Sequence, residues 1–483
     1  MTLREIEPKA LWSEFIAFNA VPRASKKEEA IRAFVLSELD KMKLPYEVDE
    51  VGNVKVEKAA SRGYESRSAI ALQAHLDMVH QKNASTSFDF ATQGIEMYVD
   101  GDWVRAKGTT LGADNGLGVA AILAVLRSDT IEHPALQVLF TIDEETGMTG
   151  AKGLKEGWLT APYLLNLDTE EDDELTIGCA GGLDTLITAD LSPIEAIPSE
   201  FQTYALEVKG LFGGHSGTDI HLGRGNANKI LFRILNALLA HSEVYLTEVD
   251  GGSLRNAIPR EAKCVFSFSS FHKEALLKSI EEWEARLKLE YSSTDPSLQL
   301  VLTEVGSTVN SISHTQSRAL IKAVMACFNG IFRMSPSVAG LVETSSNLAR
   351  IILKDGQLDV QGLQRSSVDS AKYEVSANFS APFELIGAHI VQEGEYPGWI
   401  PDPNSDLVST MHTLYRKMFN EEPKVLACHA GLECGLIGKS MPNTQMISFG
   451  PTIRNAHSPD ECAQISSSQK FWSYFLEALK SIK

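Results

Sequence analysis

Residues 136–145 read LQVLFTIDEE, an apolar run that ends abruptly in three acids. A short run of this kind without alternation predicts a strand buried in the middle of a sheet. Residues 163–168 (YLLNLD) repeat the pattern, and residues 69–79 (AIALQAHLDMV) form a third apolar run that ends in polar side chains. Residues 116–127 (GLGVAAILAVLR) predict a strongly apolar helix. Apolar strands that alternate with helices indicate an α/β layer around a mostly buried sheet.

Further along the chain, two segments indicate domain boundaries. Residues 184–207 include two prolines between strand-like runs, and residues 393–401 (EGEYPGWIP) are rich in glycine and proline. The section between them mixes strands and amphipathic helices. We expect strands at residues 204–210, 264–270 and 372–380, and helices at residues 228–241 and 274–289. The tail then resumes helix, strand and helix at residues 406–419, 445–449 and 469–482.

The expected fold class is therefore α/β, with a mixed sheet flanked by helices. One domain is built from both ends of the chain, residues 1–185 and 391–483, and an α+β domain at residues 186–390 is inserted into it. The chain of 483 residues is long enough for both domains to bury a substantial core.

Composition excludes several classes of partner. The 44 Lys and Arg against 63 Asp and Glu give a net charge of −19, and no basic stripe is present, so we expect no nucleic acid partner. No run of about 18 apolar residues occurs, so we expect no membrane association. The first residues lack the apolar core of a secretory signal. The six cysteines are scattered without a CxxC pair, which favours a reducing cytoplasm.

The polar residues at the strand ends are candidates for a metal site. In open α/β sheets, ligands bind outside the carboxyl ends of the strands. His75 and Asp77 share one face of their strand, and a carboxylate two residues away can orient a ligating imidazole. Taken alone, His75 and Asp77 are better explained as an ordinary pair at a strand end. Glu144 and Glu145 alone are also ambiguous, because paired acids usually form a solvated turn.

Two further residues have the same double interpretation. Asp114 lies in GADNG, directly before the apolar helix, and is either a helix cap or a glycine-framed ligand. His457 follows a predicted strand, but residues 458–461 (SPDE) are also a good helix start. Competing motifs fail: there is no HExxH, and Glu433 occupies the place where a P-loop before residues 438–440 would need glycine.

Together these motifs resemble the dinuclear zinc exopeptidase superfamily, along almost the whole chain. More narrowly, they resemble its aminoacyl-histidine dipeptidase group (peptidase D, carnosinase-like). The residues that carry the resemblance are His75-x-Asp77, GADNG at 112–116, DEE-x-G at 143–147, DTE at 168–170, IGCAGG at 177–182, GGHSG at 213–217, HLGRGNAN at 221–228, HAGLECG at 429–435 and HSP at 457–459.

The resemblance implies a zinc-exopeptidase catalytic domain that holds two zinc ions per chain, with cobalt or manganese as substitutes. Asp114 would bridge the metals, and a cis peptide would follow it before Asn115. The other implied metal ligands are His75 and Asp168 for one ion, and Glu145 and His457 for the other. Glu144 would be the general base, and Asp77 would orient His75.

The resemblance also assigns roles in the inserted domain, which would act as a lid of two related halves. The lid residue His215 would stabilise the oxyanion formed during hydrolysis. Asn256 and Asn347 match the family's lid asparagine in the two halves. Arg365 is the candidate for the substrate carboxylate, although a surface arginine after a strand is an equally good interpretation. Glu433 would hold the substrate amine or support the site.

The leading hypothesis is a cytoplasmic metalloprotease of the dipeptidase type. It would hydrolyse unblocked dipeptides, including Xaa-His and β-alanyl-histidine, because Asp rather than Glu at position 168 goes with dipeptidases in the family. The first alternative is an aminoacylase-like amidohydrolase of N-acyl amino acids. The second is a non-catalytic peptide-binding protein, which the presence of Asp77 and Glu144 disfavours. Whether the chain forms a homodimer is left open.

Overall fold

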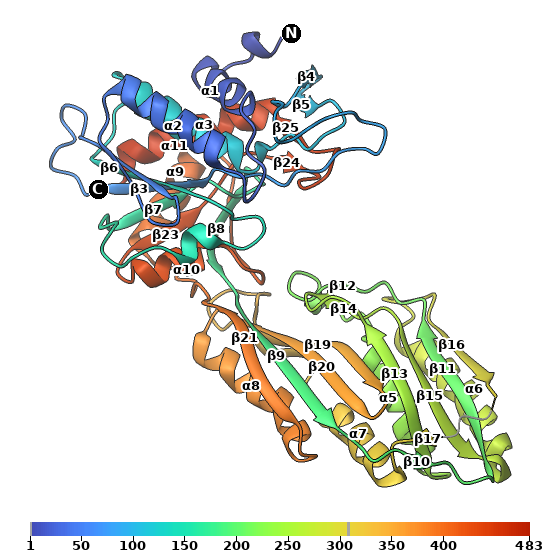
Figure 1. Ribbon diagram of the computed structural model, residues 1–483. Coiled ribbons are helices and arrows are strands. Elements are labelled where there is room, and N and C mark those ends of the chain that lie inside the picture. Colours follow the sequence, from blue (N-terminus) through green and yellow to red (C-terminus); the bar gives the residue numbers. More distant parts are fainter. Residues whose placement is uncertain (1, 307–309) are drawn as a thin grey trace. The chain divides into compact units, whose positions relative to one another are not determined.

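The apolar run within residues 136–145 forms a strand in the interior of a sheet, as expected. The computed structural model describes residues 2–306 and 310–483, which divide into two compact units. Unit 1 comprises residues 1–178, 399–427 and 432–483, and unit 2 comprises residues 179–398 and 428–431. Figure 1 labels the helices and strands of both units.

The described residues of unit 1 form an eight-stranded sheet and a smaller four-stranded sheet. The order in the large sheet is β1 (Tyr46–Val48), β2 (Val54–Lys58), β6 (Leu136–Thr141), β3 (Ile70–His75), β7 (Tyr163–Asn166), β23 (Gln445–Ser448), β8 (Glu174–Cys179) and β22 (Lys424–Cys428). The small sheet contains β24 (Ile453–Arg454), β25 (Cys462–Gln464), β5 (Trp103–Ala106) and β4 (Met97–Asp100).

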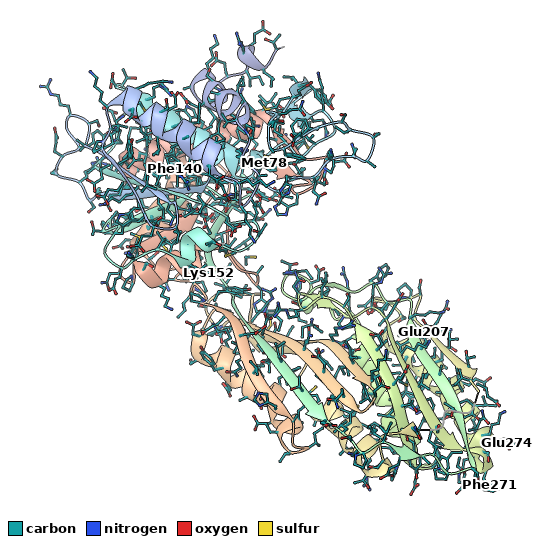
Figure 2. The ribbon with its side chains drawn as sticks, in the orientation of Figure 1. Met78, Phe140, Lys152, Glu207, Phe271 and Glu274 are labelled. Atoms are coloured by element: carbon teal, nitrogen blue, oxygen red, sulfur yellow. The ribbon has the colours of Figure 1, made fainter. Side chains whose placement is uncertain are left out.

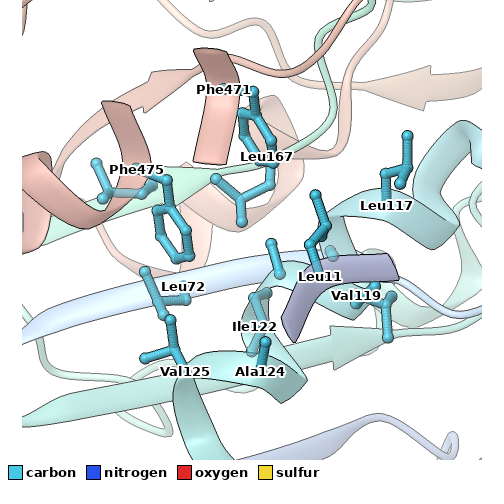
Figure 3. Close-up of a cluster of buried hydrophobic side chains, with 14 of the residues drawn as sticks. Leu11, Leu72, Leu117, Val119, Ile122, Ala124, Val125, Leu167, Phe471 and Phe475 are labelled. Carbon is cyan, nitrogen blue, oxygen red and sulfur yellow. The ribbon is translucent and has the colours of Figure 1, made fainter. Parts of the chain in front are cut away.

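Helices pack around the large sheet and help to bury its apolar strands. The helices of unit 1 are η1 (Leu3–Glu5), α1 (Lys9–Asn19), α2 (Glu29–Met42), α3 (Ala113–Arg127), α4 (Thr149–Lys152), α9 (Asp406–Phe419), α10 (Glu433–Ser440) and α11 (Ile465–Ser481). Figure 3 shows Leu72 of β3 between Val125 of α3 and Phe475 of α11, and all three side chains are fully buried. The unalternating runs of β3 and β6 are explained by this burial on both faces.

The parallel strands in the centre of the sheet position several of the candidate site residues. β3 pairs in parallel with β6, from Ile70 opposite Leu136 to His75 opposite Thr141, and on its other side with β7. β23 pairs in parallel with β7. The carboxyl ends of all four strands therefore meet at one edge of the sheet.

The described residues of unit 2 form a nine-stranded sheet covered by helices. The strand order is β16 (Gln299–Glu304), β11 (Phe201–Lys209), β15 (Ala262–Ser269), β13 (Val244–Gly252), β19 (Val342–Lys354), β20 (Gln357–Ser366), β9 (Gly181–Asp190) and β21 (His389–Tyr396), and β18 (Gly330–Met334) also pairs with β19. The helices are η2 (Ile220–Leu222), α5 (Ala227–Leu238), η3 (Ser270–His272), α6 (Lys273–Glu290), α7 (His314–Ala326) and α8 (Asp369–Glu384). Two short ribbons pair β10 (Glu195–Ala196) with β17 (Asn310–Ser311), and β12 (Gly214–His215) with β14 (Ala257–Ile258).

Aromatic side chains are buried between these layers at some positions and exposed at others. Phe140 in β6 is fully buried in unit 1, whereas Phe271, in η3 of unit 2, is 83% exposed. Figure 2 shows Phe271 and Glu274 at the surface of unit 2. None of the helices in the described ranges combines the length and apolar character that a membrane crossing requires.

The prediction of a strand at residues 372–380 is wrong, because this segment lies inside helix α8. Its apolar residues alternate over a short window, which suggested a strand. The buried residues Val375, Phe379 and Phe383 instead recur every fourth position, while Tyr373 is exposed. That spacing places one apolar stripe on one side of a helix.

The possible helix start at residues 458–461 is also not formed. The chain there makes turns and then enters β25, and the next helix, α11, begins only at Ile465. The carboxylate of Glu461 caps a different helix, far away in the sequence.

Candidate metal centre

The strand ends bring the predicted residues together in unit 1. His75 is the last residue of β3, and Asp168 follows two residues after the end of β7. Glu145 lies in the turn after β6, and Asp114 lies at the start of α3. Because β3, β6 and β7 run in parallel, their carboxyl ends meet at one edge of the sheet, as the sequence argument expected.

The carboxylate of Asp114 lies between two imidazole rings. Its Oδ1 is 3.1 Å from Nε2 of His75, and its Oδ2 is 3.2 Å from Nε2 of His457. Each imidazole also faces a second carboxylate: His75 Nε2 is 3.4 Å from Asp168 Oδ1, and His457 Nε2 is 2.9 Å from Glu145 Oε2. The five predicted ligands thus form two groups that share Asp114, and the peptide bond that follows Asp114 is cis.

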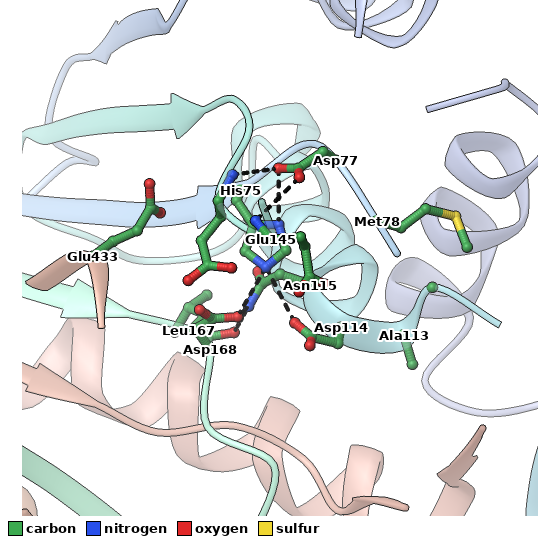
Figure 4. A network of polar contacts seen from close by, with 12 residues as sticks. His75, Asp77, Met78, Ala113, Asp114, Asn115, Glu145, Leu167, Asp168 and Glu433 are labelled. Atoms are coloured by element: carbon green, nitrogen blue, oxygen red, sulfur yellow. Dashed lines mark hydrogen bonds and ion pairs between the residues drawn. The ribbon is translucent and has the colours of Figure 1, made fainter. Parts of the chain in front are cut away.

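Asp77 holds His75 from the other side, as Figure 4 shows. Its Oδ1 is 3.3 Å from Nδ1 of His75. The same carboxylate accepts hydrogen bonds from the backbone N–H groups of Glu144 (3.0 Å) and Glu145 (3.3 Å). Asp77 therefore connects the end of β3 to the turn after β6. Burial is the largest influence and works against its charge, but the hydrogen bond and positive charge of His75 act together with further hydrogen bonds, including that from the N–H of Glu144, to lower the pKa of Asp77.

The pKa values in this cluster reflect an excess of buried acid. Burial raises the pKa of Asp168 to about 6, and burial together with the neighbouring acids raises the pKa of Glu144 well above its ordinary range. Hydrogen bonds to Asp114 and Glu145 raise the pKa of His457 to about 11. Each shift indicates that the cluster needs positive charge.

These donor atoms fit a divalent metal. One ligand atom each from His75, Asp114 and Glu145 lie within 4.8 Å of one another. Oε1 of Glu145 is buried without a hydrogen-bond partner among the described residues. Imidazole nitrogen with carboxylate oxygen is a donor set suited to zinc, and also to cobalt or manganese.

A second group of buried acids, Glu28, Asp77 and Asp143, is also close enough to hold a metal. Its oxygens, however, already accept hydrogen bonds from the protein. Asp143 accepts from the hydroxyl groups of Thr146 and Thr149, and Glu28 accepts from the backbone N–H of Asp143 at 3.2 Å. These acids therefore shape the turn that carries Glu144 and Glu145.

The sequence argument missed the role of Asn115. Its Nδ2 donates to the carbonyl of Leu167 at 2.7 Å and to Oδ1 of Asp168. It thus connects the start of α3 to the end of β7 and orients a predicted ligand (Figure 4). The only signal in the sequence is its place directly after Asp114.

Glu433, at the start of α10, is fully buried behind the strand ends. Its Oε2 accepts hydrogen bonds from Gln73 and Thr141, both at 2.7 Å, while its Oε1 has no hydrogen-bond partner among the described residues. Burial raises the pKa of Glu433 to about 8.

The predicted lid residues lie in unit 2, where two of them meet. His215 is on β12 and Arg365 is on β20, and the Nη2 of Arg365 is 3.4 Å from Nε2 of His215. Arg365 is only 4% exposed, and it also donates to the hydroxyl groups of Tyr396 (2.8 Å) and Ser216 (3.4 Å). The interpretation of Arg365 as a surface residue is therefore wrong. A buried guanidinium with neutral hydrogen-bond partners needs an anion.

The two predicted asparagines differ in their surroundings. Nδ2 of Asn347 donates to the carbonyls of Ala257 (2.7 Å) and Arg255 (3.2 Å), so this residue, buried on β19, supports the backbone around β14. Asn256 lies between those two residues with an exposed side chain, and its carbonyl accepts the N–H of Ser216. Asn256 is therefore part of the short loop that the side chain of Asn347 supports.

The chain is similar to known proteins over most of its length. The family model described as peptidase family M20/M25/M40 matches residues 71–481. The chain is 40% identical to the cytosol non-specific dipeptidase of Escherichia coli over 480 residues, which is 99% of each protein. It is 42% identical to the crystal structure of aminoacylhistidine dipeptidase from Vibrio alginolyticus, with a TM-score of 0.95 over 100% of this chain and 98% of that one.

A more distant match extends the likeness of fold. Aminopeptidase PepT from Bacillus cereus is 14% identical and has a TM-score of 0.56, with 99% of both chains covered. The match of the family model to most of the chain, together with the full-length relative, shows that this protein belongs to peptidase family M20.

Proposed function

We propose that this protein is a metal-dependent dipeptidase that hydrolyses unblocked dipeptides, among them Xaa-His and β-alanyl-histidine. The observation that carries the proposal is the shared carboxylate of Asp114, whose two oxygens face two different imidazoles at 3.1 and 3.2 Å. Such sharing suits two cations held close together. The names of the Escherichia coli and Vibrio relatives support the substrate class.

The proposed cofactor is a pair of zinc ions. His75 and Asp168 would hold one ion, Glu145 and His457 the other, and Asp114 both. When bound, the metals supply positive charge that polarises the scissile carbonyl and makes a nearby water more acidic. Asp77 would keep His75 oriented, because it already lies against Nδ1.

Glu144 is the proposed general base. Its neighbour Glu145 faces His457, and the N–H groups of both acids are held by Asp77, so the backbone that carries Glu144 is fixed. Glu144 would accept a proton from the attacking water and donate it to the amine that leaves. Burial raises the pKa of Glu144 in the metal-free protein, and nearby positive charge would favour its ionised form.

In unit 2, Arg365 and His215 are proposed to bind the charged parts of the substrate. Nδ1 of His215 accepts the N–H groups of Gly217 (3.2 Å) and Thr218 (3.1 Å), so in the neutral ring the proton is on Nε2. The N–H at Nε2 then faces an N–H of Arg365, so two hydrogen-bond donors lie side by side without an acceptor between them. Such a pair suits an anionic oxygen: a carboxylate for Arg365, and the developing oxyanion for His215.

Glu433, Asn256 and Asn347 are proposed as further substrate-binding residues. The unpartnered Oε1 of Glu433 would accept a hydrogen bond from the substrate ammonium group, while its Oε2 supports β3 and β6.

The proposed location is the cytoplasm, which the name of the Escherichia coli relative supports.

Replacing Glu144 by Gln should remove the base and leave the metal site intact. We expect kcat for a dipeptide to fall by about 10²–10⁴-fold, with the metal content unchanged by mass spectrometry. Glu156→Gln, an exposed acid in the same unit, is the matched control and should keep full activity. Wild-type turnover by E144Q would refute the role of Glu144 as base, and loss of metal would make it a ligand instead.

A substrate panel with and without a chelator tests the activity itself. Unblocked dipeptides should be hydrolysed, N-acetyl amino acids should not, and a chelator should abolish turnover until zinc, cobalt or manganese is added back. Exclusive turnover of the N-acetyl compounds would identify an amidohydrolase. Binding of dipeptides without hydrolysis in the metal-loaded protein would identify a binding protein.

Replacing Arg365 by Lys should weaken recognition of the substrate carboxylate. Since charge-assisted hydrogen bonds contribute about 1.5–3 kcal/mol, kcat/KM should fall by about 10–150-fold for a dipeptide and much less for the corresponding dipeptide amide. Arg333→Lys, on a side chain that is 55% exposed, is the control. An equal loss on both substrates would show that Arg365 does not read the carboxylate.

A further inference from the structure

Glu461 is a buried acid that the proposed mechanism does not use. It is only 2% exposed, and its carboxylate accepts hydrogen bonds from four consecutive backbone N–H groups. Oε2 accepts from Leu111 (2.7 Å) and Gly112 (2.9 Å), and Oε1 accepts from Ala113 (2.8 Å) and, more weakly, from Asp114 (3.4 Å). One side chain therefore binds the whole segment that leads to the shared ligand.

The four N–H groups belong to the segment that leads into α3, where the backbone of Asp114 is not yet helical and no preceding turn supplies carbonyl partners. Gly112 has a left-handed backbone (φ 68°, ψ 34°), which lets successive N–H groups point to one side and form an anion-binding concavity. A carboxylate is also favourable at the positive end of the helix dipole. Glu461 thus fixes the backbone from which the side chain of Asp114 extends.

The opposite side of the same segment is held by Arg23 and Asn19. Arg23 is 2% exposed and donates to the carbonyl of Gly112 and, at 3.0 Å, to the carbonyl of Asp77. Nδ2 of Asn19 donates to the carbonyl of Leu111 at 2.9 Å. The N–H groups of the segment bind Glu461 and its carbonyls bind this pair, so little freedom remains for Asp114.

Glu461 also lies four residues after His457 in the sequence. We therefore expect Glu461 to restrain the ligand group that contains His457 more than the group that contains His75. His75 and Asp168 follow strands of the buried sheet. His457 instead lies on a loop, with its side chain 53% exposed and a left-handed backbone (φ 63°). The carboxylate of Glu461 joins that loop to the Asp114 segment.

We propose that Glu461 is a positioning residue that sets how tightly the second metal position, formed by Glu145, His457 and Asp114, retains its ion. This inference rests on the proposed two-metal function. Removing such a supporting partner typically lowers metal affinity about 10–100-fold, and here the loss should fall on one of the two ions.

The test compares Glu461→Gln with Asp460→Asn, which makes the same charge change one residue earlier on an exposed side chain. The amide of E461Q would turn a donor toward the backbone N–H groups. Each purified holoenzyme is dialysed against increasing chelator, and zinc per chain is measured by mass spectrometry. We expect wild type and D460N to keep two ions under conditions in which E461Q keeps one. Glu461→Asp, whose shorter carboxylate reaches fewer N–H groups, provides the same comparison if E461Q does not fold.

The outcomes separate the inference from the proposed function. If E461Q keeps both ions as tightly as wild type, the inference is wrong. It is also wrong if E461Q loses both ions together and its metal-free form unfolds earlier than that of D460N, since Glu461 would then support the fold alone. If wild type itself never binds two ions, the two-metal function fails and the inference fails with it.

Discussion

The candidate site of unit 1 depends on one carboxylate that is shared between two imidazoles. Asp114 faces His75 with one oxygen and His457 with the other. These histidines come from opposite ends of the chain, so the site is complete only because both ends belong to one unit. It also explains the supports around it: Asn115 connects the same segment to Asp168, and Glu461 binds its backbone.

The buried acids of this cluster reduce the stability of the fold, which indicates that they are present for a function. Burial raises the pKa of Asp168 and of Glu144, which means that ionising these acids in the metal-free fold is unfavourable. Natural proteins tolerate such unfavourable buried groups mainly at functional sites. Bound cations reverse the balance, because they favour ionised carboxylates and neutral imidazoles. The same reasoning applies in unit 2 to the buried cation Arg365, whose hydrogen-bond acceptors are the neutral hydroxyl groups of Ser216 and Tyr396.

The positions of several candidate ligands could be predicted from the sequence, because these residues stand at or just after the ends of predicted strands. The unalternating runs at 69–79, 136–145 and 163–168 located the central parallel strands, and parallel pairing brought their terminal acids to one edge. The strand predicted at 372–380 failed because a short window of alternation also fits one buried stripe of helix α8. The supports of Asp114 could not be predicted, because Glu461 and Leu111 are 350 residues apart and no local pattern relates them. Arg365 likewise gave no sign of burial, which depends on its neighbours in the sheet.

The central claim is that Asp114 is shared by two metal ions. Anomalous X-ray diffraction from crystals of the zinc-loaded protein, recorded at the zinc edge, tests this claim most directly. We expect two peaks of comparable height, one between Asp114 and His75 and the other between Asp114 and His457. A single peak, or two peaks that do not both contact Asp114, would contradict it.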